Sequence, residues 1–437
     1  MKRHLPLPLV FFQKSQDSIK KINFLDFIPK IVYIVPRSTK IILFFSHFKG
    51  DDFMIINYSF RTWYRFLAIA LILWGGASFH SSPFHTAQAQ DAAKSEPPKP
   101  APAFNFTAYV DAYYAFDNDN TVIQGLPRGA RQYSYLGFIR NQFSLNTAQI
   151  TGSLVADDYR AFLTLAYGGL RTSAYEPFSI FNTLQQANGG FRIVDKLWID
   201  GGLFMTHIGG ESLLPKDNWF TLYSFATTNE PFYQAGVRLS YEGSLVQAQV
   251  HLLNGYGIFE DNNDDKSIGW FIGFTPSPTF SATLSGIAGN EQALGSPKAT
   301  RIYNDLVLNY QPIDQLAFKA ELDYAIEEMP ATRSSGSYLA SFVAVRYAII
   351  PNLFLSGRFE YVVNANGANA DVPIIIPNAL RGTGYSASLE YRPFPNTYVR
   401  GELRALQFDD KYKIFLDANQ RATGSRLEGV FTLGVWL

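Results

Sequence analysis

Short segments in which apolar and polar side chains alternate recur from residue 104 to the end of the chain at residue 437. Residues 246–252 (VQAQVHL) alternate at every step, and residues 316–324 (LAFKAELDY) do so with both charge signs on one face. Residues 399–404 (VRGELR) repeat the pattern. Because successive side chains of a β-strand point to opposite faces, each segment has one apolar face and one polar or charged face. The sequence therefore predicts an all-β fold.

The connections between these segments alternate in length. Seven short connections fall at 157–158, 195–196, 242–244, 276–278, 312–315, 350–352 and 393–396. Eight long ones fall near 117–137, 170–183, 206–231, 254–266, 291–300, 327–337, 364–383 and 407–424. A soluble sandwich has no reason to sort its connections in this way, whereas an outer-membrane barrel has short periplasmic turns, long external loops and an even number of strands. We predict a closed antiparallel transmembrane β-barrel of about 16 strands, with both of its ends on the short-turn side.

Aromatic residues recur close to the expected strand ends, where outer-membrane barrels carry aromatic girdles. The residues concerned are Tyr109, Tyr113, Tyr114, Phe116, Tyr167, Tyr241, Tyr310, Tyr324, Tyr347, Tyr361 and Tyr391. As a set they favour a membrane barrel over a soluble sheet.

The last predicted strand alternates up to the final residue of the chain. Phe431, Leu433, Val435 and Leu437 share one face, which we assign to lipid, and Trp436 is next to last. A terminal amphipathic strand of this kind resembles the signal that barrel-assembly machinery reads, although that signal usually ends in an aromatic residue. We interpret these five residues as the assembly signal.

Four short motifs support a family resemblance: 108–114 (AYVDAYY), 140–146 (RNQFSLN), 196–202 (KLWIDGG) and 230–236 (EPFYQAG). Through their order and spacing, residues 104–437 resemble the OmpL-like β-barrel porin-2 family of Gram-negative outer membranes. The resemblance implies a porin-like barrel and carries over neither a substrate nor a catalytic signature.

The N-terminal part has the pattern of an export signal. Arg61 and Arg65 precede an apolar run at 66–79, and the small-x-small triplet at 87–89 follows. A transmembrane helix would need roughly 20 apolar residues, which this run lacks. We assign 54–89 as a signal peptide beginning at Met54, 1–53 as a mis-assigned N-terminal extension, 90–103 as a Pro-rich spacer and 104–437 as the barrel, and we expect the outer membrane of a Gram-negative bacterium as its location.

Composition excludes several other functions. The chain has no cysteine, which removes disulfides, zinc–thiolate sites and thiol nucleophiles. Residues 1–89 carry 11 Lys and Arg against 4 Asp and Glu, whereas the rest of the chain carries 26 against 33. A folded part with an acidic excess is not expected to bind nucleic acid.

Catalytic residues are scarce, and we predict no enzymatic activity and no cofactor. Only His207 and His251 lie beyond the predicted cleavage site, and no HExxH, P-loop or GxSxG motif occurs. We expect His251 to be a solvated lumen residue and His207 to be a hydrated loop residue.

An acidic run at 260–265 resembles calcium ligands in composition, but it lacks the spacing of an EF-hand loop. Glu260, Asp261, Asp264 and Asp265 form at most a weak cation or lipopolysaccharide site, and a solvated acidic loop is the alternative. No other metal site is predicted.

Charged residues on the polar strand faces are the main candidate functional set, because a cation facing lipid would cost roughly 2–4 kcal/mol at the midplane. The predicted lumen and constriction residues are Arg160, Arg238, Lys319, Glu321, Asp323, Arg346, Arg358, Glu360, Glu390, Arg400, Glu402 and Arg404. Two roles stay open for them: they pair across strands and solvate the wall, or they create a transverse field that orients polar solutes.

These features favour a channel for passive diffusion of small hydrophilic solutes with weak ion selectivity. The alternative is a structural or adhesive surface barrel acting through long loops such as 206–231 and 364–383, and an outer-membrane enzyme is disfavoured by the scarcity of histidine. The expected partners are outer-membrane lipid, lipopolysaccharide, the assembly machinery and small polar solutes. A monomer and a homo-oligomer are both compatible with the sequence.

Signal processing gives the first testable prediction. We expect cleavage between Ala89 and Gln90, because the basic, apolar and small-residue regions follow one another in the order that signal peptidase requires. N-terminal sequencing of protein purified from the membrane should begin at Gln90. A sequence that begins before Met54 would contradict both the start site and the signal peptide.

Overall fold

The computed structural model describes residues 31–37, 40–45, 54–59, 102–123, 126–132, 134–170, 183–329, 334–365, 380–409 and 411–437. The chain divides into two units, Met1–Lys94 and Ser95–Leu437, which are described separately. In the first unit, β1 (Ile31–Arg37), β2 (Lys40–Phe45) and β3 (Met54–Ser59) form an antiparallel sheet in that order. Beyond residue 59, the predicted signal peptide and its cleavage site lie outside the described residues, as does most of the predicted spacer.

The second unit is built from long strands. They are β4 (Ala103–Asp117), β5 (Phe143–Val155), β6 (Tyr159–Tyr167), β7 (Leu184–Val194), β8 (Leu197–Met205), β9 (Tyr233–Glu242), β10 (Val246–Leu253), β11 (Ser267–Ser277), β12 (Phe280–Asn290), β13 (Thr300–Ile313), β14 (Leu316–Met329), β15 (Ser334–Ile350), β16 (Leu353–Ala365), β17 (Arg381–Tyr391), β18 (Thr397–Phe408) and β21 (Ser425–Trp436). The described helical segments of this unit are short, and none of them is long and apolar enough to cross a membrane.

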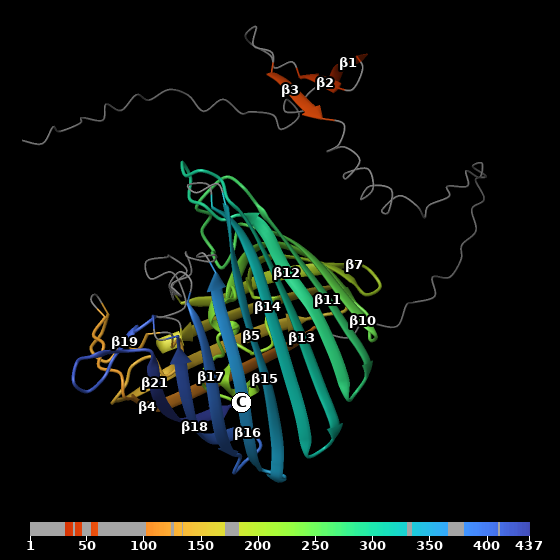
Figure 1. Ribbon diagram of the computed structural model, residues 1–437. Helices are drawn as coiled ribbons and strands as arrows, with labels where there is room; N and C mark the ends of the chain where they lie inside the picture. The colour runs from red at the N-terminus through yellow and green to blue at the C-terminus, as the bar shows by residue number, and fades with distance from the viewer. Residues whose placement is uncertain are drawn as a thin grey trace, which may run out of the picture. The chain divides into compact units, whose positions relative to one another are not determined.

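These sixteen strands form one closed antiparallel barrel, as predicted (Figure 1). Each strand pairs with its neighbour in the sequence, apart from β19 (Phe415–Leu416) and β20 (Ala422–Thr423), which make a small hairpin outside the barrel order. Pairing of β21 with β4, from Glu428 opposite Asp117 to Trp436 opposite Tyr109, closes the sheet. Closure leaves no strand edge with unpaired backbone groups, which a bilayer would not tolerate.

Short and long connections lie at opposite ends of the barrel. The short ones are 156–158, 195–196, 243–245, 278–279, 314–315, 351–352 and 392–396. Ala103 at the start of the barrel pairs with Val155 beside the first short turn, and the Trp436 amide donates to the Asn396 carbonyl in the last one. Both ends of the barrel therefore lie on the short-turn side, as predicted.

One predicted loop is wrong. We expected a long connection at 327–337, but the ladder between β14 and β15 continues without a register shift to Met329 opposite Ser334. Only 330–333 are left to connect the two strands, and they lie outside the described residues. Residues 327–329 and 334–336 continue the strand pairing instead of forming turns.

The two faces of each strand have the predicted environments. On β14, Phe318 and Leu322 are exposed on the outer wall, whereas Glu321 and Asp323 are buried on the lumen side. On β21, Phe431, Leu433, Val435 and the following Leu437 are all exposed on the outer face, the side that we assigned to lipid.

Trp436 points the other way. Its ring lies 6.5 Å from the ring of Tyr109 and 6.2 Å from that of Tyr398. Tyr109 and Tyr113, which we expected in an aromatic girdle, are likewise buried on the inner face. Alternation places them there, because they share the face of β4 that carries Asp111.

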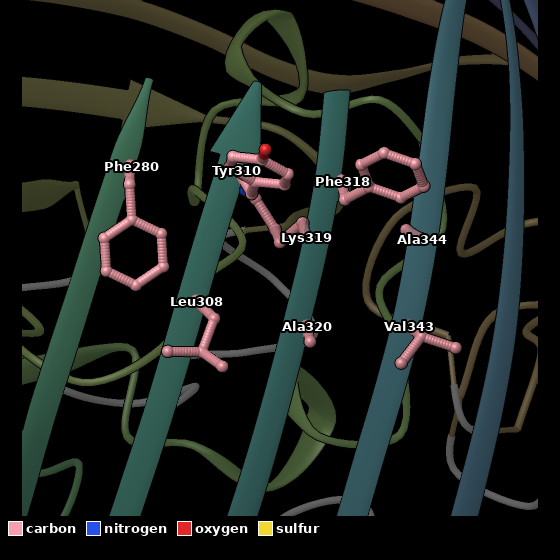
Figure 2. Close-up of a pocket in the computed structure, with 8 residues that line it drawn as sticks. All are labelled: Phe280, Leu308, Tyr310, Phe318, Lys319, Ala320, Val343 and Ala344. Atoms are coloured by element: carbon pink, nitrogen blue, oxygen red, sulfur yellow. The ribbon is translucent and has the colours of Figure 1, made fainter. Parts of the chain in front are cut away.

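Part of the predicted girdle is confirmed. Tyr241, Tyr310, Tyr347 and Tyr391 are exposed within a few residues of the short-turn ends of their strands. Figure 2 shows the ring of Tyr310 between those of Phe280 and Phe318 on neighbouring strands.

The Tyr310 and Phe318 rings stack with centroids 6.4 Å apart. The hollow of about 460 Å³ that this group lines is apolar and opens on the outer wall, where lipid would cover it (Figure 2). It is therefore a feature of the lipid-facing surface and not a solute site.

The outward orientation of Leu322 can be tested with a charged substitution. Leu322→Arg places a cation in the middle of β14 on the lipid side, and it should lower the free energy of unfolding by about 2–4 kcal/mol. Urea titration of the barrel in lipid vesicles would measure this loss.

Leu245→Arg is the matched control. Leu245 is exposed in the short turn 243–245, where the same substitution should cost about 1 kcal/mol or less. Equal losses at both positions would contradict the assigned membrane boundaries.

Candidate functional site: the lumen and its inward loop

The connection between β8 and β9, residues 206–232, folds into the barrel and is called the inward loop below. It contains two turns of 3-10 helix, η2 (Pro215–Asp217) and η3 (Thr227–Asn229). Every residue from 220 to 235 is buried. The expectation that 206–231 forms a surface loop is therefore wrong, because this segment packs against the inner wall of the barrel.

Carboxylates of the wall hold the backbone of the inward loop. Glu402 Oε2 accepts hydrogen bonds from the amides of Thr221 (2.6 Å) and Leu222 (2.9 Å). Glu360 Oε2 accepts one from the amide of Phe225 (2.8 Å). An irregular segment inside a membrane protein needs partners of this kind, because its backbone groups have no strand to pair with.

Arginines of the wall bind the carbonyl groups of the same loop. Arg400 donates to the carbonyls of Pro215 (3.0 Å) and Asn218 (2.6 Å), and Arg358 donates to that of Leu222 (2.9 Å). The guanidinium of Arg358 also lies 4.5 Å from the centre of the Phe220 ring. Wall charges of both signs thus attach the loop to one side of the barrel.

Glu211 connects the first part of the inward loop to a later part of the same loop and to the barrel wall. Its carboxylate accepts from the Ser224 amide (2.7 Å) and the Thr227 hydroxyl (2.8 Å) and forms an ion pair with Arg358 (2.7 Å). Burial alone would raise the pKa of Glu211, but the charge of Arg358 and these hydrogen bonds lower it below its ordinary value. Glu211 is therefore a carboxylate at neutral pH.

The wall charges also neutralise one another. The carboxylate of Glu390 forms ion pairs with Arg346 (2.7 Å), Arg392 (2.8 Å) and Arg400. Removing one partner from a buried ion pair is costly, because the other charge is then left without compensation. This cluster therefore behaves as a structural unit.

A second set of ion pairs lies beside it. Arg404 binds Glu360 (2.7 Å) and Glu428 (3.3 Å), and Glu428 also binds Arg426 (2.8 Å) and Arg131. Arg131 belongs to the β4–β5 connection, so this second loop is tied to the wall as well.

The β4–β5 connection adds a further layer of packing inside the barrel. The Tyr135 ring lies edge-on to Phe232 with centroids 4.7 Å apart, and its hydroxyl contacts the Thr228 carbonyl at 3.4 Å. Leu136 packs in the same hydrophobic cluster. Two loops therefore share the filling of the lumen.

All twelve predicted lumen residues lie on the inner face of the barrel, but they fall into two groups. Arg160, Arg238, Lys319 and Arg346 keep partial exposure. The other eight are buried: Glu321, Asp323, Arg358, Glu360, Glu390, Arg400, Glu402 and Arg404. Arg400 and Arg404, two of the predicted lumen and constriction residues, are covered by the inward loop and paired with carboxylates.

Space remains on the side of the lumen formed by β9 to β11. A cavity of about 430 Å³ is bounded by residues 205–213 and by Arg238, Gln249 and Phe271. Arg238 shares the carboxylate of Asp200 (3.0 Å) with Arg160, which binds it through two nitrogens at 2.6 and 2.7 Å. This polar side is the candidate site for passage of solutes.

The two histidines meet although 44 residues separate them. The rings of His207 and His251 stack with centroids 4.0 Å apart, and burial lowers the pKa of His207. Our expectation that His251 is solvated is wrong, because it is 1% exposed. His207 is partly exposed at the cavity and contacts Gln234 (2.8 Å) and the Gly286 carbonyl (3.0 Å). Among the described residues, the hydrogen bonds of these rings involve no carboxylate or hydroxyl, so they do not form a nucleophile–base pair.

The acidic run at 260–265 is engaged with lysines. Asp261 pairs with Lys266 (2.5 Å), and Asp265 pairs with Lys298 (2.6 Å), whose hydrogen bond lowers the pKa of Asp265. These two carboxylates of the loop are therefore compensated by neighbouring lysines.

Comparison with known proteins agrees with the fold. Residues 103–435 match the profile of the family described as "Putative beta-barrel porin-2, OmpL-like". The chain belongs to this family. No curated protein sequence is significantly similar to it.

Solved structures of outer-membrane barrels share the architecture of this porin-2 family member at low sequence identity. OmpT of Vibrio cholerae is 13% identical with a TM-score of 0.52, and the match covers 79% of this chain and 100% of that one. An anion-selective porin from Comamonas acidovorans is 10% identical (TM-score 0.52, 77% and 100% covered). The channel DcaP of Acinetobacter baumannii is 11% identical (TM-score 0.52, 77% and 97% covered). These similarities show the outer-membrane barrel fold.

The attachment of the inward loop can be tested at Glu360. Glu360→Gln removes the charge that compensates Arg404 and weakens the acceptor of the Phe225 amide, so unfolding should become easier by about 3–5 kcal/mol. Denaturant titration measures the change.

Asp417→Asn is the control for this experiment. It breaks the exposed ion pair with Arg421 (2.9 Å) and should leave the unfolding midpoint nearly unchanged. If Glu360→Gln were equally silent, the wall carboxylates would not hold the loop.

Proposed function

We propose that this protein is a porin-like channel for passive diffusion of small hydrophilic solutes across the outer membrane of a Gram-negative bacterium. The observation that carries the proposal is the polar cavity beside the inward loop, within a closed sixteen-strand barrel. Barrels of this size have room for an aqueous channel. The inward loop narrows the lumen on one side and leaves the side of Arg238 for solutes.

Weak ion selectivity follows from the charges next to this cavity. Arg160 and Arg238 face the carboxylates of Asp200 and Glu242, so two positive groups meet two negative ones. The buried ion pairs elsewhere compensate one another and contribute little field to a solute. A mixed wall of this kind orients polar molecules without excluding either ion sign.

The other partners follow from the outer wall. Its apolar stripe would contact outer-membrane lipid and lipopolysaccharide, and the terminal strand would be read by the assembly machinery. The alternative function, surface adhesion through long loops, cannot use residues 206–231 as a surface loop, because that segment lies inside the barrel. It would depend on 364–383, of which 366–379 lie outside the described residues.

Single-channel recording in planar bilayers tests the proposal. Purified protein should produce stepwise conductance increases in potassium chloride. A correctly folded barrel that never conducts would contradict the channel function and favour the adhesive alternative.

Arg238 should influence which ions pass. Arg238→Gln removes a cation beside the cavity, while Asp200 keeps both hydrogen bonds from Arg160, so the barrel should fold normally. The reversal potential in a salt gradient should move towards cation preference.

Arg421→Gln provides the matched control. It removes the same charge from the exposed connection between β18 and β21 and should leave the reversal potential unchanged. An unchanged reversal potential for Arg238→Gln would place the conducting path elsewhere in the lumen.

A further inference from the structure

Four carboxylates meet where the inward loop crosses β13 and β14. Glu230 comes from the end of the loop, Asp305 from β13, and Glu321 and Asp323 from β14; we call them the carboxylate cluster. One oxygen each from Glu230, Glu321 and Asp323 lies within 4.8 Å of the others. Asp305 is the direct cross-strand neighbour of Asp323. All four side chains are at least 97% buried.

The carboxylate cluster differs from the other buried acids of the lumen. Glu360, Glu390 and Glu428 each bind arginines, whereas within the described part of the chain no lysine or arginine forms an ion pair with the cluster. The nearby ammonium of Lys319 donates instead to the Gly210 carbonyl (2.6 Å). The cluster therefore concentrates negative charge that the described side chains do not compensate.

Among the described residues, several oxygens of the cluster are buried and lie within hydrogen-bond geometry of no donor. They are Glu230 Oε1, Asp305 Oδ1, Glu321 Oε1 and both carboxylate oxygens of Asp323. A buried carboxylate oxygen without a donor is costly, and five such atoms lie together here.

Loop amides orient the carboxylates so that these oxygens stay free. The Gly210 amide donates to Glu321 Oε2 (2.9 Å), and the Gly209 amide donates to Asp305 Oδ2 (3.1 Å). Gly209 has a φ of +103°, and a Cβ there would overlap the carboxylate of Glu230. A Cβ at Gly210 would overlap Glu321. The two glycines therefore let the loop backbone approach the cluster closely, while one oxygen of each anchored carboxylate remains available.

We propose that the carboxylate cluster binds one hard divalent cation of the calcium class, which fastens the inward loop to the barrel wall. Oxygen ligands alone, most of them anionic, are the donor set that such cations prefer. The ion would join Glu230, near the end of the loop, to strands β13 and β14. Gly209 and Gly210, near the start of the loop, lie beside the same site. It would supply the positive charge that arginines supply elsewhere in the lumen.

The test uses the whole barrel, purified in detergent and treated with EDTA. Equilibrium dialysis against Ca²⁺ should give one bound ion per chain, and Ca²⁺ should raise the melting temperature relative to EDTA because it binds the folded state. Elemental analysis before and after EDTA treatment detects an ion that was acquired during assembly.

Asp323→Asn is the decisive variant. It keeps the shape of the side chain and removes repulsion, so it should fold, but it should weaken Ca²⁺ binding by about tenfold or more because one anionic ligand is lost. The Ca²⁺-dependent rise in melting temperature should shrink accordingly. Glu230→Gln, on the loop side of the cluster, should have the same effect and serves if Asp323→Asn does not assemble.

Asp264→Asn is the matched control. It removes one charge from the exposed acidic run and should leave the binding of this ion unchanged. The proposal is overturned if wild type binds neither Ca²⁺ nor Mg²⁺. It is also overturned if Asp323→Asn binds these ions as tightly as wild type does, or if only Asp264→Asn loses binding. Conductance is recorded separately, so that failure of the ion site and failure of the channel function are distinguishable.

Discussion

Pairing of every backbone group is the constraint on which this structure depends. In lipid, a sheet with a free edge would leave a row of unpaired amides and carbonyls, so sixteen strands must close, and β21 closes the barrel against β4. Closure also fixes the two environments of each strand. Every second side chain faces lipid, and those between them face an interior in which charges are acceptable only when they are compensated.

The interior meets this second condition through the inward loop. Glu402 and Glu360 bind its amides, whereas Arg400 and Arg358 bind its carbonyls. Charges that would line a wide lumen therefore become anchors for a segment that covers them. What remains accessible, around Arg238 and Asp200, is a smaller and nearly balanced polar surface. The same arrangement thus both stabilises the loop and narrows the lumen of the barrel.

Much of the barrel could be predicted from the sequence, because period-two alternation and connection length are local properties that report directly on strand faces and barrel ends. The burial of Arg400 could not be predicted, because it depends on a loop that lies about 180 residues earlier in the chain. A signal was present: residues 218–229 (NWFTLYSFATTN) carry no charge and include four aromatic residues, which is unusual for a surface loop. The carboxylate cluster was missed because Glu230 joins the strand residues only after the loop folds inward.

The inward loop follows β8 in the sequence. The wall residues that bind its backbone lie on strands from β13 to β18, later in the chain. Without the C-terminal strands, the loop can pack against Tyr135 and Leu136 of the β4–β5 connection but lacks the carboxylates and arginines that hold its backbone. Its apolar segment around Phe225 finds its binding site only after the C-terminal strands are in place. The narrowing of the lumen therefore requires the C-terminal strands, and the loop links two halves of the barrel that otherwise share only two strand seams.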